Sequence, residues 1–226
     1  MPQIQEFGHC WKELPLLAHI PVYSFDELLG NLNKFHISFV GVGYHGAVFK
    51  IENFLSSGTD ATLKMIPTAE VMSAADFQPF TDVASVDIYD SGIDYLLDIC
   101  TSRRRHVNLV LSQTAGHVLG NTISPQHIDT PICIWARKED GEYSALGYSI
   151  PFVDGTAVRI GDHDQIAKVA DKLEMEHNLY VGSRGEMSNT SCNAILLPND
   201  SFRFIDVRLW DEFDYSLPEH STNSTI

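Results

Sequence analysis

The sequence has few basic residues and no paired cysteines, and each of these features argues against a class of protein. It has 15 lysine and arginine residues against 30 aspartate and glutamate residues, which gives a formal net charge of -15. Because binding to a phosphate backbone needs a positive surface, this charge argues against nucleic acid as a partner. The four cysteines are scattered without a C-x-x-C pair, so neither a structural zinc site nor a disulfide framework is indicated.

Long hydrophobic runs are also lacking. No apolar run reaches the length of a membrane-spanning helix, and no basic-then-apolar signal peptide opens the chain. We therefore expect no membrane span and a cytoplasmic working compartment. The 226 residues and the ordinary hydrophobic fraction of 44% fit one large domain or two small lobes.

The most informative stretch contains Gly41, Gly43 and Gly46, followed by Val48, in the pattern G-x-G-x-x-G-x-V. The residues before it alternate and those after it are β-branched and aromatic, so both flanks predict strands. A dinucleotide-binding turn opens a helix at this point, whereas this pattern opens a second strand. We therefore expect the glycines at the tip of a hairpin, where a backbone without side chains can close over phosphates.

A third strand is predicted over residues 61–66, and Lys64 is its only charge. From such a position a lysine can place its ammonium group against the α- and β-phosphates of a nucleotide. The alternative interpretation is an edge-strand charge beside an ordinary hairpin. The sequence does not choose among three candidates for a carboxylate partner of this lysine, which are Glu70, Asp76 and Asp82.

Other patterns along the chain predict further elements. Ser24 and Glu27 form a capping box before a short helix that is expected to pack against the sheet. The region 106–130 is expected to form no long element, because glycines and a proline interrupt it. The remaining predictions are helices over 68–77, 82–101 and 164–177, strands over 132–136 and 143–150, a linker over 151–155, and a hairpin of 194–197 with 202–205.

Asn193 and Asp206 bracket the last predicted hairpin, which places their side chains near each other at its base. An amide oxygen beside a carboxylate suits a hard cation such as magnesium. For this pair alone, the alternative interpretation is a turn-capping asparagine and a solvent-facing aspartate.

Together, the glycine pattern, the strand-three lysine and the hairpin pair resemble the protein-kinase superfamily. In this resemblance, Asn193 corresponds to the catalytic-loop asparagine and Asp206 to the D-F-G aspartate. The resemblance covers roughly residues 36–210 and implies an α+β, bilobal kinase-like fold with an antiparallel-sheet N-lobe and a truncated helical C-lobe. The implied organisation is an N-terminal extension with a short helix over 1–35, an N-lobe over 36–150, and a C-lobe with an acidic tail over 151–226.

The resemblance also implies ATP and magnesium as cofactors and a phosphotransferase that acts on a protein hydroxyl. Lys64 and the glycine loop with Val48 would hold ATP, whereas Asn193 and Asp206 would hold magnesium. The implied catalytic residues are Lys64, Glu186 and Asp206. The implied acceptor is a host or cellular protein.

Two departures from the family pattern bear on activity. The aspartate expected five positions before Asn193 is Ser188, and Glu186 is the only carboxylate in that loop. Only 20 residues follow Asp206, so the activation segment and the helices behind it are expected to be missing. This layout resembles the minimal kinase effectors that bacterial pathogens inject into host cells. That resemblance implies that the protein could also be delivered into a host cell by a route other than general secretion.

Three functions therefore stay open. The first is a phosphotransferase in which Glu186 orients the acceptor hydroxyl, since phosphoryl transfer depends largely on positioning and charge stabilisation. The second is a pseudokinase, which would bind nucleotide without catalysis, and Ser188 at the base position favours it. The third is transfer of AMP on the same fold, which needs the lysine and the metal but not the usual base.

Overall fold

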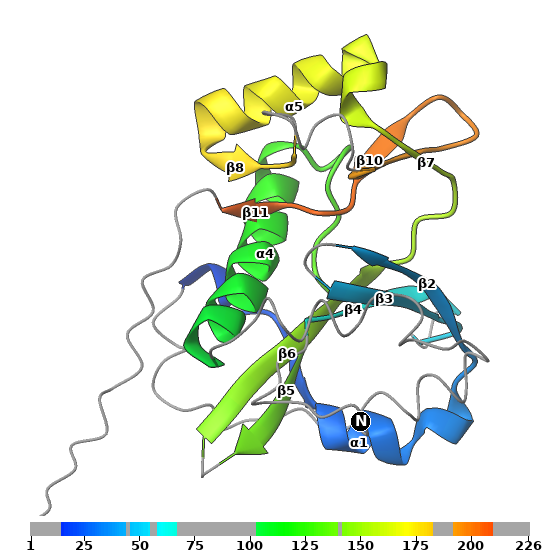
Figure 1. Ribbon diagram of the computed structural model, residues 1–226, viewed down its shortest axis with the longest axis vertical. Coiled ribbons are helices and arrows are strands. Elements are labelled where there is room, and N and C mark those ends of the chain that lie inside the picture. Colours follow the sequence, from blue (N-terminus) through cyan, green and yellow to red (C-terminus); the bar gives the residue numbers. More distant parts are fainter. Residues whose placement is uncertain are drawn as a thin grey trace, which may run out of the picture.

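A six-stranded sheet forms the lower part of the molecule in the computed structural model (Figure 1). The structure describes residues 15–43, 46–54, 58–66, 103–139, 142–182 and 192–209. The strands of this sheet are β1 (Val22–Ser24), β2 (Ile37–Gly43), β3 (Gly46–Ile51), β4 (Ala61–Met65), β5 (Cys133–Glu139) and β6 (Glu142–Pro151). They lie in the order β1-β5-β6-β4-β3-β2; β1 pairs with β5 in parallel, and the other neighbours are antiparallel. The protein is therefore α+β.

The strands predicted around the glycine stretch and over residues 132–150 are confirmed as β2 to β6. The N-terminal extension contains more than the predicted short helix, because β1 joins the sheet beside β5 and a 3-10 helix, η1 (Pro15–Leu17), precedes it. A strand of three residues is too short to show an alternating pattern.

The predicted short helix is confirmed as α1 (Phe25–Gly30), and a turn of 3-10 helix, η2 (Leu32–Lys34), follows it. The Ser24 hydroxyl accepts a hydrogen bond from the Glu27 backbone N–H at 3.3 Å, which caps the helix. Glu27 Oε2 is buried and has no hydrogen-bond partner in the described part of the chain.

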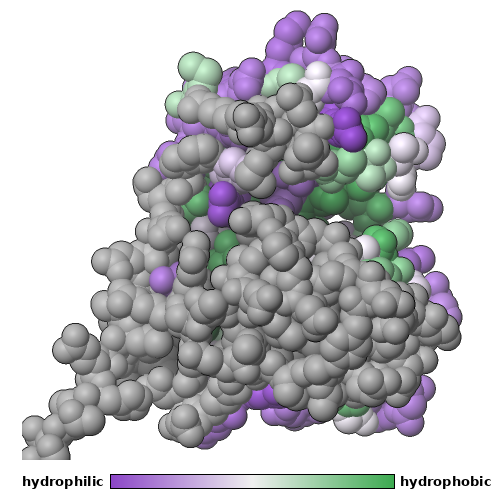
Figure 2. Space-filling view, viewed as in Figure 1, coloured by the Kyte–Doolittle hydropathy of each residue, from purple (hydrophilic) through white to green (hydrophobic). Residues whose placement is uncertain are grey.

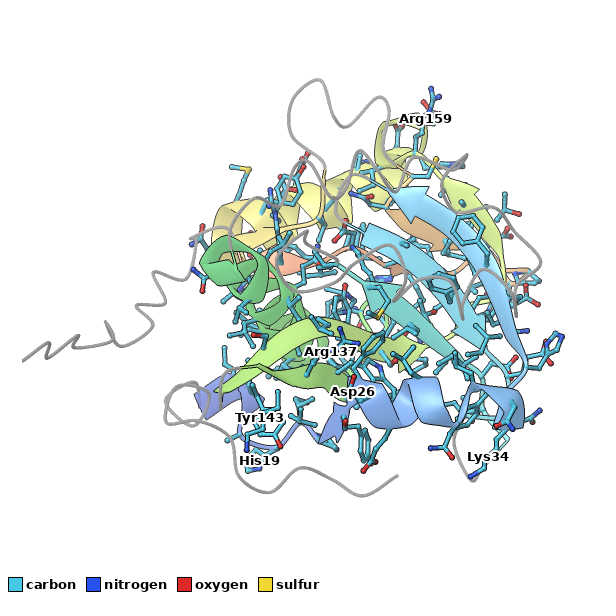
Figure 3. The ribbon with its side chains drawn as sticks, turned by 60° about the horizontal axis from the view of Figure 1, so that its bottom comes forward. His19, Asp26, Lys34, Arg137, Tyr143 and Arg159 are labelled. Atoms are coloured by element: carbon cyan, nitrogen blue, oxygen red, sulfur yellow. The ribbon has the colours of Figure 1, made fainter. Side chains whose placement is uncertain are left out.

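Helix α1 covers one face of the sheet, as the sequence predicts. Phe25 and Leu28 are fully buried there, in a cluster with Phe49 and Trp135 from the strands. At the edge of this contact, Asp26 lies beside Arg137 of β5 (Figure 3), with Oδ1 3.0 Å from Nε.

Helix α4 (Arg103–Ile123) covers the opposite face of the sheet and is one continuous helix of 21 residues. The expectation that region 106–130 forms no long element is therefore wrong. Gly116 and Gly120 lie within this helix. A Cβ at these positions would collide with Arg208 and Ile128 respectively, so the close approach of these neighbours requires glycine despite its low helix propensity. The helices predicted over 68–77 and 82–101 lie outside the described residues.

The upper part of the molecule contains α5 (Asp164–His177), which has the bounds that the sequence predicts. Its apolar face packs against a hairpin, and its outer face belongs to the hydrophilic top of the molecule (Figure 2). The predicted last hairpin is confirmed. The smaller elements are β7 (Thr156–Val158), η4 (Ile160–Asp162), β8 (Leu179–Tyr180), β9 (Ala194–Leu196), β10 (Phe202–Phe204) and β11 (Arg208–Leu209).

Two small sheets connect the upper elements. Strands β10, β9 and β7 form one of them, and β11 pairs with β8 to form the other. Helix α4 contacts β11 as well as the large sheet, so it joins the upper and lower parts (Figure 1). Among the described residues, no helix is both long and apolar enough to cross a membrane.

Candidate functional site

The glycine-rich stretch forms the predicted hairpin, in which Gly43 pairs with Gly46 at the strand ends. Gly46 has a φ of +155°, and a Cβ at this position would collide with the carbonyl oxygen of Met65 on β4. Glycine is therefore required here by strand packing. Gly41 differs, because no described atom lies within 4 Å of the position that its Cβ would occupy. The hairpin is thus open to a ligand beside Gly41.

Lys64 lies on β4, which has β3 on one side and β6 on the other. The interpretation of Lys64 as an edge-strand charge is therefore wrong. The residue is only 8% exposed, and its Nζ lies 3.0 Å from Asp206 Oδ1. Its partners on the neighbouring strands are Val48 and Tyr148.

Asp206 follows β10 and binds two other parts of the molecule through one oxygen. Gln113 of α4 donates a hydrogen bond from Nε2 to Asp206 Oδ1 at 3.0 Å, beside the ion pair with Lys64. The side chains of Lys64 and Asp206 are 10% and 21% exposed, so water screens their attraction only partly. The structure thus brings Lys64 and Asp206 into contact, and the solvent-facing interpretation of the aspartate is wrong.

The carboxylate beside Lys64 is therefore Asp206. The three carboxylates considered as its partner from the sequence, Glu70, Asp76 and Asp82, lie outside the described residues.

Three buried polar residues close to this pair were not predicted. Gln113 and His117 lie one turn apart on the same helix, and both are fully buried. Tyr148 lies on β6 opposite Lys64, and its ring is 5.7 Å from that of His117. The signal in the sequence was two polar residues at i, i+4 spacing, which becomes visible only once the region is recognised as one helix.

Burial sets the protonation states of His117 and Tyr148. Desolvation lowers the pKa of His117 to about 4, although the backbone carbonyl of Asp129 and the charge of Asp206 act in the opposite direction. Desolvation also raises the pKa of Tyr148 well above its ordinary value, and the charge of Asp206 adds to this effect. Both side chains are therefore neutral at pH 7.

Within the part of the chain that the structure describes, each of these three residues has one buried polar atom without a hydrogen-bond partner. The atoms are Gln113 Oε1, His117 Nε2 and Tyr148 Oη. Since buried polar atoms are nearly always paired, such a group beside an ion pair is typical of a functional site rather than of a structural core.

Asn193 precedes β9, and its backbone oxygen accepts a hydrogen bond from the Ile205 N–H at 3.0 Å. This bond places Asn193 beside the backbone that leads into Asp206. The Asn193 side chain donates from Nδ2 to the Val181 carbonyl at 3.3 Å. Its amide oxygen is thereby left as the end available to a ligand.

Two predicted site residues lie outside the described residues. They are Glu186 and Ser188, and the loop that contains them falls in the gap between residues 182 and 192. The role of Glu186 therefore stays a prediction.

The donor set fits magnesium better than it fits a transition metal. Asn193 and Asp206 offer an amide oxygen and a carboxylate, and magnesium bound with a nucleotide usually takes one or two protein oxygens, with phosphates and waters as its other ligands. Among the described residues, no group of three or more His, Cys, Asp or Glu residues could hold a metal ion.

In comparisons with known proteins, the sequence matched no protein-family model and no curated protein.

Proposed function

We propose that the chain binds ATP and magnesium between the glycine hairpin and Asp206, and that it is a kinase-like phosphotransferase acting on a protein hydroxyl. In this proposal the large sheet with α1 and α4 is the N-lobe of a bilobal fold, and the elements after residue 151 form a truncated C-lobe. The phosphoryl group would be accepted by an exposed hydroxyl of a host or cellular protein.

The observation that carries the proposal is the 3.0 Å ion pair between Lys64 and Asp206. These residues come from distant parts of the chain, and the sequence pattern independently predicts phosphate binding for Lys64 and metal binding for Asp206. A lysine on the third strand and an aspartate after the last hairpin are the two groups that kinases use to hold ATP and its metal.

The order of elements supports the same proposal. A glycine hairpin leads to the lysine strand, a helix follows that contacts the lysine's partner, and then come two strands, the linker and α5. In kinases the corresponding helix provides a glutamate for the lysine. Helix α4 contains no acidic residue, and its Gln113 bonds to Asp206, so among the described residues the carboxylate partner of Lys64 is Asp206.

The roles of the residues follow from their chemistry. Lys64 would leave Asp206 and contact phosphate oxygens, because an ammonium group attracts a phosphate as strongly as it attracts a carboxylate. Asp206 and Asn193 would then bind magnesium through oxygen. Magnesium, when bound, would neutralise charge on the phosphates. The open position at Gly41 would let the hairpin backbone approach the nucleotide.

Two observations favour the alternatives of a pseudokinase or an AMP transferase. The usual base position holds Ser188, and α4 contains no acidic residue that could pair with Lys64. Both changes remove groups that kinases use for turnover, whereas the groups needed for nucleotide and metal binding remain.

One experiment separates these functions. The purified protein is incubated with magnesium and a protein acceptor mixture, and with ATP labelled at either the γ- or the α-phosphate. Transfer of the γ label alone supports a phosphotransferase, and transfer of the α label supports AMP transfer. A rise in melting temperature with ATP but no transfer supports a pseudokinase.

The control variants are chosen from the same sheet. Lys64→Ala should abolish the ATP-dependent rise in melting temperature, while Lys50→Ala should keep it, because Lys50 pairs with Asp60 outside the site. Equal ATP binding by the parent and Lys64→Ala would refute the proposed site.

A further inference from the structure

Glu174 is a buried acid on α5 that the proposed function does not use. Among the described residues, only Lys64 and Glu174 are acidic or strongly basic residues with less than 9% exposure. Burial of a carboxylate is costly unless hydrogen bonds compensate. Glu174 Oε1 accepts a hydrogen bond from the Val181 backbone N–H at 3.1 Å, where the chain leaves β8.

Val181 connects Glu174 to the candidate metal ligand. Its N–H is bonded to Glu174, and its carbonyl accepts the hydrogen bond from Asn193 Nδ2 at 3.3 Å. The next residue, Gly182, has a φ of +87°, and a Cβ there would collide with Asn193 Nδ2. Glycine at 182 therefore leaves room for the amide group of Asn193 in this orientation.

We propose that Glu174 is a positioning residue for magnesium: through Val181 it fixes the orientation of the Asn193 side chain so that Oδ1 faces the cation. This inference rests on the proposed function, because it assigns a role within the same site. The hydrogen-bond chain is Glu174 Oε1 to Val181 N–H, and Val181 C=O to Asn193 Nδ2.

The physical reason is that an asparagine amide has two different ends. One end donates and the other accepts, and only the oxygen binds a hard cation. A bond from Nδ2 to a fixed carbonyl prevents the amide from turning its NH₂ group towards the metal. Partners that orient a metal ligand in this way typically change metal affinity about 10- to 100-fold when they are removed.

The first measurement concerns the Asn193 side chain itself. In ¹⁵N-labelled protein, the Asn193→Asp variant identifies the side-chain NH₂ signal of Asn193. Glu174→Ala should shift this signal and speed the exchange of its protons with water, whereas Glu174→Gln should preserve it, since a glutamine oxygen can accept the same bond. Glu176→Ala is the matched control, because Glu176 is exposed on the same helix.

The second measurement is the magnesium dependence of nucleotide affinity, determined by calorimetry with ADP in the presence and absence of magnesium. Glu174→Ala should reduce the gain in affinity that magnesium provides by about tenfold, leave metal-free ADP affinity unchanged, and be rescued by Glu174→Gln. A purely structural role would lower the melting temperature without changing the gain from magnesium. Glu174→Met replaces the alanine variant if the latter does not fold, because it fills the same volume without an acceptor.

Each contrary result overturns the inference. An unchanged Asn193 signal in the variant without an acceptor refutes the hydrogen-bond chain. If Glu174→Ala changes the Asn193 signal but not the gain in ADP affinity from magnesium, a role of the hydrogen-bond chain in metal binding is refuted. If Glu174→Gln behaves like Glu174→Ala, the hydrogen bond is refuted as the cause. If the parent shows no magnesium-dependent ADP binding, the proposed function is refuted, and the metal role of Glu174 is refuted with it. In that case the Asn193 side-chain signal still tests separately whether the hydrogen bonds from Glu174 through Val181 orient Asn193.

Discussion

The Lys64–Asp206 ion pair is the contact on which the proposed site depends, and a double-mutant cycle tests it directly. Lys64→Met removes the ammonium group but keeps much of the side-chain length, and Asp206→Asn removes the negative charge but keeps an acceptor for Gln113. Urea unfolding of the parent, both single variants and the double variant gives the coupling free energy between the two charges.

The expected coupling follows from the geometry. Two unit charges 3.0 Å apart attract by about 5 kcal/mol at an effective dielectric constant of about 20. Desolvation of two largely buried charges opposes this attraction, so we expect a net coupling of about 2 kcal/mol. The pair of Lys50 and Asp60, with Nζ 2.9 Å from Oδ2, is the matched control. Its coupling should be smaller because both side chains are more exposed, at 24% and 30%.

The same cycle measured with saturating magnesium and ADP tests the exchange of partners. If Lys64 turns to phosphate and Asp206 to the metal, their direct coupling should fall. A coupling below about 0.5 kcal/mol in the free protein, within the usual error of additivity, would refute the ion pair as a stabilising contact. An unchanged coupling in the presence of bound nucleotide would refute the exchange.

Three further predictions concern neighbouring residues. For His117, the folded pKa of about 4 lies below the ordinary value of 6.5, so its contribution to stability is complete above pH 6.5 and is lost as the pH falls towards 4. This loss amounts to about 3 kcal/mol of the free energy of unfolding. His117→Gln should therefore flatten the pH dependence of the free energy of unfolding, measured with urea, over this window. Gly46→Ala should lower the free energy of unfolding by about 2 kcal/mol or more because its Cβ collides with β4, whereas Gly41→Ala should leave stability unchanged and weaken ADP binding measured by calorimetry. Glu186→Gln should lower turnover in the γ-label assay without changing ATP affinity, and unchanged turnover would leave the chain without a base in that loop and favour the pseudokinase or AMP transferase.

The sequence predicts the strands and the hairpins well, because each has a local signal. Alternating residues mark the strands around Gly43, and turn residues mark the hairpin before Phe202. Helix α5 is also marked by a local signal, because its sequence has one apolar face and one polar face. Lys64 and Asp206 could be nominated for the same reason, as each is a charge placed beside an apolar strand.

Helix α4 could not be predicted, because the properties that make it a helix lie elsewhere in the chain. It is buried against the sheet on one side and against β11 on another, so its sequence shows no polar face to contrast with an apolar one. From the local sequence, Gly116 predicts an interruption of the helix. In the structure it is the position at which the backbone of Arg208 approaches the helix. Gln113 was missed with the helix, since a glutamine in an apparent loop indicates nothing.

This contact between α4 and the segment after Asp206 bears on how the site is assembled. Gly116 allows the close approach of Arg208, the Ser112 hydroxyl donates to the Leu209 carbonyl at 3.2 Å, and Gln113 donates to Asp206. Two positions of the helix therefore fix the backbone after Asp206, and a third binds its carboxylate. The segment of Asp206 is held to α4 through backbone packing and hydrogen bonds, whereas its side chain contacts the sheet through the ion pair with Lys64. Since backbone packing resists displacement more than one side-chain contact does, a nucleotide that enters beside Gly41 would separate Lys64 from Asp206 without moving Asp206 from α4.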